Sequence, residues 1–329
     1  MDFDQEEIRV IHYFMKQIVP EVSVLGLIAS FGLTVFLTAK FGDRLPRDAG
    51  REFAHDGKLS AGKPRGAGLI FVLVFVISAL IFAPLNREMI IYLLLVCAEM
   101  MTGYLDDAAE HPWGELRKGL LDLVVAVILA VTYLSFNSNT IRIATLKLSV
   151  TIPPVLFGIL IIILVWGAIN VTNCADGVDG LSGTLAIITL SSFYIIDHLI
   201  GTGDEFNLLI VMFILCILGY LWYNATPSHV LMGDAGSRAM GIFISIAALK
   251  SESPILYIPI AIVLILDGGL GLVKVSLIRL FHIHILTKVR TPLHDHVRKN
   301  MGWSNTQTVF RYAIIQILAA MAVIVLILS

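Results

Sequence analysis

The chain has 329 residues, of which 57% are hydrophobic and only 15% are charged, and its mean hydropathy is +0.86. A soluble domain of this length needs more charged surface, so the composition excludes a soluble globular protein and indicates a polytopic membrane protein. The formal net charge of −2 says little, because the placement of Lys and Arg, and not their sum, orients a membrane protein.

Apolar stretches long enough to cross a bilayer recur along the whole chain. We expect ten spans, near residues 21–40, 66–85, 88–105, 119–136, 153–172, 178–198, 207–223, 236–250, 254–281 and 309–328. No second soluble domain is left over, so the sequence predicts one integral membrane domain, residues 1–329, with an all-α fold of about ten transmembrane helices. The first stretch lacks a small-residue cleavage site and is expected to stay as the first span.

The ninth stretch differs from the others in length and in composition. Residues 254–281 are too many for one perpendicular crossing, and Asp267-Gly268-Gly269 interrupts them. Glycines weaken a helix at such a point, so we expect the ninth helix to be broken or bent.

Most Lys and Arg residues fall in the loops that follow odd-numbered spans. The positive-inside rule makes those loops cytoplasmic. Ten spans then place both termini outside. The same parity puts four polar motifs on the cytoplasmic side, so motifs that are far apart in the sequence can form one set of active-site loops.

These motifs contain acids at the ends of apolar segments, where an unpaired charge is energetically unfavourable. An isolated charge at the bilayer centre costs at least about 2.5–3.5 kcal/mol. Acids beside glycines at such positions indicate a site for a cation or for an ion-dependent substrate. The acid motifs are Asp106-Asp107, Asn170-x-x-Asn173-x-x-Asp176-Gly177-x-Asp179-Gly180, Met232-Gly233-Asp234-x-Gly236-Ser237 and Asp267-Gly268-Gly269. The run His294-Asp295-His296 is the fourth polar motif of the cytoplasmic loops.

Asp106 and Asp107 end the third predicted span. Neighbours on a helix point about 100° apart, so one of them can face a metal or a substrate while the other faces a different partner. The alternative is a pair of acids that only terminates the helix.

Asn170, Asn173, Asp176 and Asp179 recur at every third residue. If this stretch is helical, they form one polar stripe that offers amides and carboxylates to a metal or a sugar. The alternative is a polar seam between two membrane helices. Two aspartates make a seam expensive, which favours a functional stripe.

Asp234 lies between two glycines just before the eighth span, where the free N–H groups of a helix start can meet a phosphate. Its alternative role is a helix cap. His294 and His296 lie beside cations and can bind phosphate or transfer protons near neutral pH. The neighbouring acids favour a hard cation such as Mg²⁺ over a transition metal. The basic, glycine-rich loop from Lys58 to Gly68 can hold a diphosphate or can simply anchor the chain at the cytoplasmic face.

In this order, the motifs resemble those of the polyprenyl-phosphate N-acetylhexosamine-1-phosphate transferases over roughly residues 44 to 311. Within that superfamily, His294 and His296 followed by Gly302-Trp303 resemble the phospho-N-acetylmuramoyl-pentapeptide transferases. The resemblance implies an Mg²⁺-dependent enzyme of the bacterial inner membrane whose active site faces the cytoplasm. Such an enzyme transfers phospho-MurNAc-pentapeptide from UDP-MurNAc-pentapeptide to undecaprenyl phosphate, making lipid I and UMP for peptidoglycan.

The resemblance also implies roles for particular residues. Asp106, Asp107, Asp234, His294 and His296 become catalytic, with Asp234 as the Mg²⁺ ligand. Substrate binding falls to Lys58, Lys118, Asn173, Asp176, Asp179 and Asn224.

Three positions depart from the family pattern. The family has histidine at the position of Asp295, lysine at that of Glu110 and commonly an aromatic residue at that of Leu231. This chain therefore has neither a middle imidazole nor an aromatic side chain at these positions.

Several alternatives stay open at this point. A sister branch transfers GlcNAc-1-phosphate from UDP-GlcNAc, and an ion-coupled transporter would also contain buried acids, of which Asp267 is the one expected within a span. The lipid phosphate can attack directly, or an aspartate can first form a covalent intermediate. The apolar final helix makes a homodimer a further expectation, and no nucleic-acid partner is expected.

Overall fold

The computed structural model describes residues 5–50, 60–111, 113–202 and 205–329, and side chains from residue 22 onward within those ranges. Helices occupy all ten predicted stretches. Nine are continuous: α1 (Gln5–Phe41), α2 (Gly68–Phe82), α3 (Arg87–Asp107), α4 (Glu115–Phe136), α5 (Pro154–Cys174), α6 (Leu181–Ile200), α7 (Phe206–Asn224), α8 (Gly233–Lys250) and α13 (Asn305–Leu328).

Among the described residues, seven helices have the length and apolar composition that cross a membrane, and a bent pair raises the number to eight. α2 is apolar but has only 15 residues. α8 has 18 residues and carries three charged side chains, those of Asp234, Arg238 and Lys250. The all-α, polytopic membrane fold is confirmed, whereas ten crossings stay a prediction.

The ninth stretch is broken, as the sequence predicts. Its parts are η4 (Pro254–Leu256), α9 (Tyr257–Ile260), α10 (Ile262–Leu264), the π-helical segment η5 (Ile265–Gly269) and α11 (Leu270–Phe281). The chain bends by 72° between Pro254–Ile260 and Ile262–Phe281, so the break is at Ala261 and not at Asp267-Gly268-Gly269. Those three residues instead form part of the π-helical segment. A Cβ on Gly268 would lie 2.0 Å from the Val171 carbonyl oxygen, so this glycine lets the segment pack closely against α5.

Three further elements lie in regions that the sequence analysis left as loops. They are α12 (Leu293–Met301) and an antiparallel hairpin of β1 (Thr140–Ile143) and β2 (Leu148–Thr151), which pairs Thr140 with Thr151 and Ile143 with Leu148. Short 3₁₀ turns, η1 (Gly42–Arg44) and η3 (Ala144–Leu146), end α1 and connect the strands.

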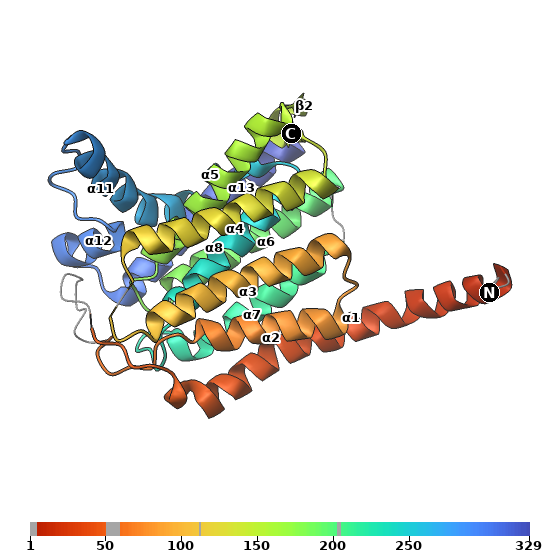
Figure 1. The fold of residues 1–329 in the computed structure, drawn as a ribbon, viewed down its shortest axis with the longest axis horizontal. Helices are drawn as coiled ribbons and strands as arrows, with labels where there is room; N and C mark the ends of the chain where they lie inside the picture. Colours follow the sequence, from red (N-terminus) through yellow and green to blue (C-terminus); the bar gives the residue numbers. More distant parts are fainter. Residues whose placement is uncertain (1–4, 51–59, 112, 203–204) are drawn as a thin grey trace.

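α8 forms the centre of the bundle. Every residue from Gly233 to Leu249 is buried, and the helix packs against α2, α3, α5 and α6 (Figure 1). Glycines bring its first turn close to two neighbours. A Cβ on Gly103 of α3 would lie 2.4 Å from the Asp234 carbonyl group, and one on Gly68 of α2 would lie 2.0 Å from the Gly236 nitrogen. The start of α8 is therefore held between the end of α3 and the start of α2.

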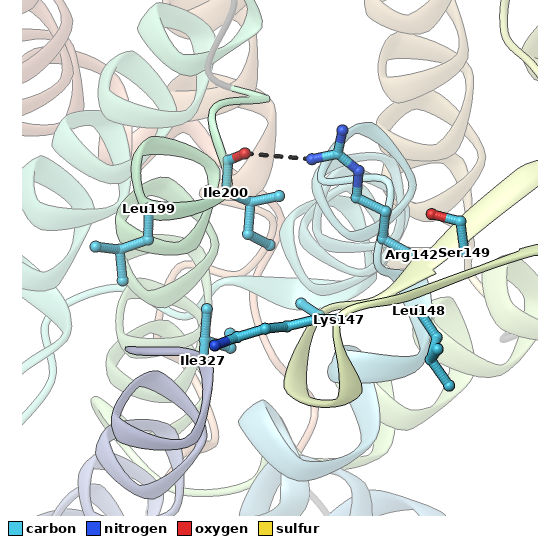
Figure 2. Close-up of a pocket in the computed structure, with 8 residues that line it drawn as sticks. Arg142, Lys147, Leu148, Ser149, Leu199, Ile200 and Ile327 are labelled. Atoms are coloured by element: carbon cyan, nitrogen blue, oxygen red, sulfur yellow. Dashed lines mark hydrogen bonds between the residues drawn. The ribbon is translucent and has the colours of Figure 1, made fainter. Parts of the chain in front are cut away.

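The two ends of the bundle differ. The hairpin, the start of α1 and the end of α13 lie at one end, and α12 lies at the other (Figure 1). A cavity of about 420 Å³ is present at the hairpin end, where an Arg142 Nη1 donates a hydrogen bond of 3.2 Å to the Ile200 carbonyl (Figure 2). Lys147 and Ile327 also line it, and none of the predicted site residues does.

Candidate functional site

Asp106, Asp107 and Asp234 meet at the end of the bundle that is away from the hairpin. The first two are the last residues of α3, and Asp234 is the second residue of α8. The tight packing of α3 on the first turn of α8 brings these acids together, although 127 positions separate Asp107 from Asp234.

Asp107 binds the backbone at the buried start of α8. Its Oδ1 accepts a hydrogen bond of 3.1 Å from the N–H of Asp234, and its Oδ2 accepts one of 3.1 Å from the N–H of Ala235. First-turn N–H groups have no partner within their own helix, so this carboxylate caps α8 from another helix. Gly233, with φ +71°, provides the space for this carboxylate, because a Cβ there would lie 2.2 Å from Asp107 Oδ2.

Two cations lie between the three acids. Asp234 Oδ1 is 3.1 Å from Arg65 Nη2, and Asp234 Oδ2 is 3.2 Å from Lys118 Nζ. Arg65 Nε is 2.9 Å from Asp107 Oδ1, and Lys118 Nζ is 2.6 Å from Asp106 Oδ2. Each cation thus joins Asp234 to one member of the Asp106-Asp107 pair. We call these five residues the acid–cation cluster.

Arg65 remains charged in this cluster. Burial alone would lower the pKa of its guanidinium, but the carboxylates of Asp107, Asp234 and Asp48 outweigh burial and raise the pKa above its ordinary value. The Asp48 carboxylate completes the surroundings of Arg65 at 3.4 Å. A permanent cation with several donors is suited to phosphate as well as to carboxylate.

Backbone pairing places Arg65 in the cluster. The segment Pro64–Gly68 lies beside Leu231 and Met232: the Leu231 N–H donates to the Pro64 carbonyl at 2.7 Å, and the Gly68 N–H donates to the Met232 carbonyl at 3.0 Å. The sequence distinguishes this loop by its cations and glycines but indicates no particular role for Arg65. The available signal was Pro64-Arg65-Gly66, in which Gly66 adopts φ +90°. Lys58 lies outside the described residues.

The predicted stripe of Asn170, Asn173, Asp176 and Asp179 is not one helical face, because α5 ends at Cys174 and the two aspartates lie in the turn before α6. Asn173 Nδ2 donates to Ser237 Oγ at 2.9 Å and so joins α5 to the first turn of α8. Asp176 accepts from Ser182 Oγ at 2.6 Å. The prediction of one helical stripe was therefore wrong, although the side chain of Asn173 does contact α8.

Asp179 and Asn224 brace the neighbouring loops. Asp179 Oδ2 accepts from the Ser228 N–H at 3.1 Å and lies 3.8 Å from Lys63 Nζ. Asn224 is buried, accepts from the Gly180 N–H at 2.8 Å and donates to the Val230 carbonyl at 2.8 Å. These contacts hold the turn after α5 against the loop between α7 and α8.

The two histidines of α12 have different surroundings. His294 is buried, with its Nδ1 2.8 Å from Asp267 Oδ2 and its backbone N–H donating to Asp267 Oδ1 at 2.6 Å. His296 is half-buried, and its Nδ1 accepts from the Arg290 N–H at 3.3 Å. Asp295, at the position of the family's middle histidine, lies 3.6 Å from both Arg290 Nε and Arg298 Nη1.

Charged side chains also lie inside the bundle beneath the cluster. Arg238 of α8 is buried, pairs with Asp122 of α4 and lies 3.5 Å from Glu99 of α3. Asn170 Nδ2 donates to Asp122 at 3.0 Å. The sequence predicts Asp267 alone as an acid within a span. The buried Glu99 and Asp122 correct that prediction, and their positions inside two apolar stretches were the available signal.

The chemistry of the donors fits Mg²⁺ in one respect. Carboxylate oxygens are the ligands Mg²⁺ prefers, and it is commonly held by one or two carboxylates together with substrate phosphates. Within the part of the chain that the structure describes, no group of three or more His, Cys, Asp or Glu residues is arranged to hold a metal by itself. Asp234 is therefore a candidate ligand that needs phosphate oxygens to complete a site.

Comparison with known proteins gives two consistent findings. Residues 89–252 match the profile of glycosyl transferase family 4, a region that contains α3, α4, α5 and α8 but neither Arg65 nor α12. A phospho-N-acetylmuramoyl-pentapeptide-transferase of Treponema pallidum is 41% identical over 310 residues, which cover 89% of this chain and 85% of the relative.

Relatives of lower identity have the same name. The protein of Symbiobacterium thermophilum is 30% identical over 260 residues, covering 75% of this chain and 77% of the relative. That of Clostridium acetobutylicum is 27% identical over 289 residues, covering 85% and 88%.

Proposed function

Because the chain belongs to the phospho-N-acetylmuramoyl-pentapeptide-transferase family, we propose that it transfers phospho-MurNAc-pentapeptide from UDP-MurNAc-pentapeptide to undecaprenyl phosphate in peptidoglycan biosynthesis. The products are lipid I and UMP. We place the active site at the acid–cation cluster, in which Asp106, Asp107 and Asp234 alternate with Arg65 and Lys118.

The reaction joins two anions, so the site has to neutralise charge before they meet. An oxygen of the lipid phosphate attacks the phosphorus that carries the sugar, a new P–O–P linkage forms, and the bond to UMP breaks. Arg65 and Lys118 supply two positive charges beside Asp234, at the start of α8. Mg²⁺, held by Asp234 and the diphosphate, would stabilise the negative charge that develops on departing UMP.

The surroundings of Asp106 and Asp107 support different roles for these two acids. Both oxygens of Asp107 accept bonds from the backbone of α8, and its side chain is inaccessible, so we assign it to positioning Asp234. Asp106 contacts Lys118 and accepts from the Trp113 N–H at 2.6 Å. We assign Asp106 to orienting or deprotonating the lipid phosphate.

We propose the direct path over a covalent aspartyl intermediate. The oxygens of Asp107 are occupied by the backbone of α8, and those of Asp106 are occupied by the Trp113 N–H and Lys118, which makes both poor nucleophiles. Asp234 is neutralised by two cations. Trapping a phosphorylated or glycosylated enzyme during turnover would overturn this choice.

We further propose that the cluster faces the cytoplasm of a bacterial inner membrane. The cation-rich loops belong to that end of the bundle, and ten crossings with both termini outside agree with the position of the start of α1 and the end of α13 at the other end (Figure 1). A homodimer remains a prediction.

Release of UMP by detergent-purified protein tests the function. The protein receives undecaprenyl phosphate and Mg²⁺, with UDP-MurNAc-pentapeptide or UDP-GlcNAc in parallel reactions. We expect lipid-dependent release from the muramoyl substrate only. Release only from UDP-GlcNAc would move the chain to the sister branch, and no release from either by folded protein would contradict the transferase assignment.

A further inference from the structure

Asp267 contributes nothing to the acid–cation cluster, yet it is completely buried and both of its oxygens are engaged. It belongs to the π-helical segment η5, which packs against α5 through Gly268. Oδ1 accepts the backbone N–H of His294 at 2.6 Å, and Oδ2 lies 2.8 Å from the Nδ1 of the same residue. One carboxylate thus holds both the backbone and the ring of a single histidine.

This two-point contact determines which ring nitrogen is presented elsewhere. An ionised carboxylate only accepts hydrogen bonds, so the Nδ1 beside it carries the proton. The Nε2 then has a lone pair when the ring is neutral and an N–H when the ring is charged. Its distance of 4.0 Å from Asp295 Oδ1 is too long for a competing hydrogen bond.

Gly177 shows where the Nε2 edge of the ring lies. A Cβ on Gly177 would be 2.2 Å from His294 Nε2, so the ring packs directly on the backbone of the turn between α5 and α6. The same turn follows Asn173, whose side chain binds Ser237 in the first turn of α8. His294 is thereby joined to the helix that carries Asp234 through one short segment of chain.

We propose that Asp267 is a positioning residue, which holds His294 with its Nδ1 protonated and its Nε2 turned to the Asn173–Gly180 turn. Asp267 itself touches no substrate. The inference rests on the proposed function for the claim that His294 acts in catalysis, and on geometry alone for the claim that Asp267 sets the state of the ring. The π-helical segment gives Asp267 its place, because it brings an acid from within the bundle to the start of α12.

A double-mutant cycle tests the catalytic part. Steady-state UMP release is measured for Asp267→Asn, His294→Ala, the double variant and Asp267→Glu in the full-length protein. We expect Asp267→Asn to lower kcat by about 10- to 100-fold with KM for UDP-MurNAc-pentapeptide changed less than about threefold, as for other residues that orient a histidine. The double variant should be no slower than His294→Ala, and Asp267→Glu should recover part of the loss.

Losses that multiply in the double variant, or a loss confined to KM, would overturn the proposal. Glu252→Gln is the matched control, because Glu252 is a half-exposed acid at the hairpin end that lies 3.2 Å from Arg142. Its kcat should stay within about twofold of the parent value, since surface ion pairs contribute little.

A measurement without turnover separates this proposal from the proposed function. ¹⁵N-histidine spectra of the purified protein, with His294 identified by its loss in His294→Ala, report which ring nitrogen is protonated. We expect the Nδ1–H form in the parent and a shift toward Nε2–H in Asp267→Asn. An unchanged His294 signal would refute the role of Asp267 even if the enzyme is active. The expected shift in a protein that releases no UMP would refute only the function.

Discussion

The side chain of Arg65 lies between Asp107 and Asp234, with Nε 2.9 Å from Asp107 Oδ1 and Nη2 3.1 Å from Asp234 Oδ1. These contacts join the loop before α2 to the end of α3 and to the start of α8. A planar guanidinium can make both contacts at once, whereas the ammonium of a lysine is a single point of charge. Arg65 therefore both neutralises the acids and sets the distance between them.

We expect Arg65→Ala to lower kcat at least about 100-fold and Arg65→Lys to recover only part of that loss, because removing one preorganised electrostatic contact typically costs this much. Steady-state UMP release checks the prediction. Arg47→Ala is the control, since Arg47 is an exposed residue of the same loop that lies 3.9 Å from Asp43. If Arg65→Ala kept the parent kcat, as Arg47→Ala should, Arg65 would not belong to the site.

Gly103→Ala should displace the start of α8. The added Cβ would lie 2.4 Å from the Asp234 carbonyl group, and overpacking of this kind costs about 1–3 kcal/mol. We expect a lower thermal unfolding temperature in detergent together with loss of UMP release. Gly32→Ala, which meets no atom within 4 Å, should leave both unchanged. A stable and fully active Gly103→Ala would show that α8 tolerates displacement there.

Removal of divalent cations should abolish turnover, and Mg²⁺ should restore it, because the candidate ligand is a carboxylate assisted by phosphate oxygens. In Asp234→Asn, we expect residual activity to require at least about tenfold more Mg²⁺, since loss of even an outer-shell partner of a metal ligand weakens a site by about 10- to 100-fold. A titration of UMP release against Mg²⁺ measures both effects. Turnover that persists in excess chelator would contradict the assignment.

Cysteine labelling tests the orientation of the bundle. In a variant in which Cys97, Cys174 and Cys216 are replaced, Ser149→Cys in the hairpin and Lys299→Cys in α12 both place an exposed thiol at an end of the bundle. A membrane-impermeant maleimide added to intact spheroplasts should label Ser149→Cys at once and Lys299→Cys only after lysis. The opposite pattern would invert the topology.

Hydrophobic length predicted the helices well, because each apolar stretch has to satisfy its own backbone hydrogen bonds in a membrane and forms a helix. It could not decide whether α8 crosses, since its 18 residues include Arg238, whose charge is compensated by Glu99 and Asp122 of other helices. The hairpin and α12 escaped prediction because they are short and lie outside the apolar stretches. The break at Ala261 comes two residues after Pro259, whose missing N–H weakens a helix, whereas the prediction rested on the glycines beside Asp267.

The motifs located the acids of the site because each motif, Asp106-Asp107 and Met232-Gly233-Asp234, can be recognised within a few residues of sequence. The contacts that these acids make depend on tertiary packing. Arg65 is placed by backbone pairing of its loop with the segment before α8, and Asp267 is brought beside His294 by the bend in the ninth stretch. Periodicity also failed for Asp176 and Asp179, because the helix that would align them ends at Cys174.

Direct detection of the lipid product tests the central claim. Purified protein is incubated with UDP-MurNAc-pentapeptide, undecaprenyl phosphate and Mg²⁺, and the lipid fraction is analysed by mass spectrometry for the parent chain and for Asp234→Asn. Lipid I in the parent reaction, formed in equal amount with UMP and nearly absent with Asp234→Asn, is the predicted result. UMP without lipid I, or equal lipid I from both proteins, would contradict transfer at the acid–cation cluster.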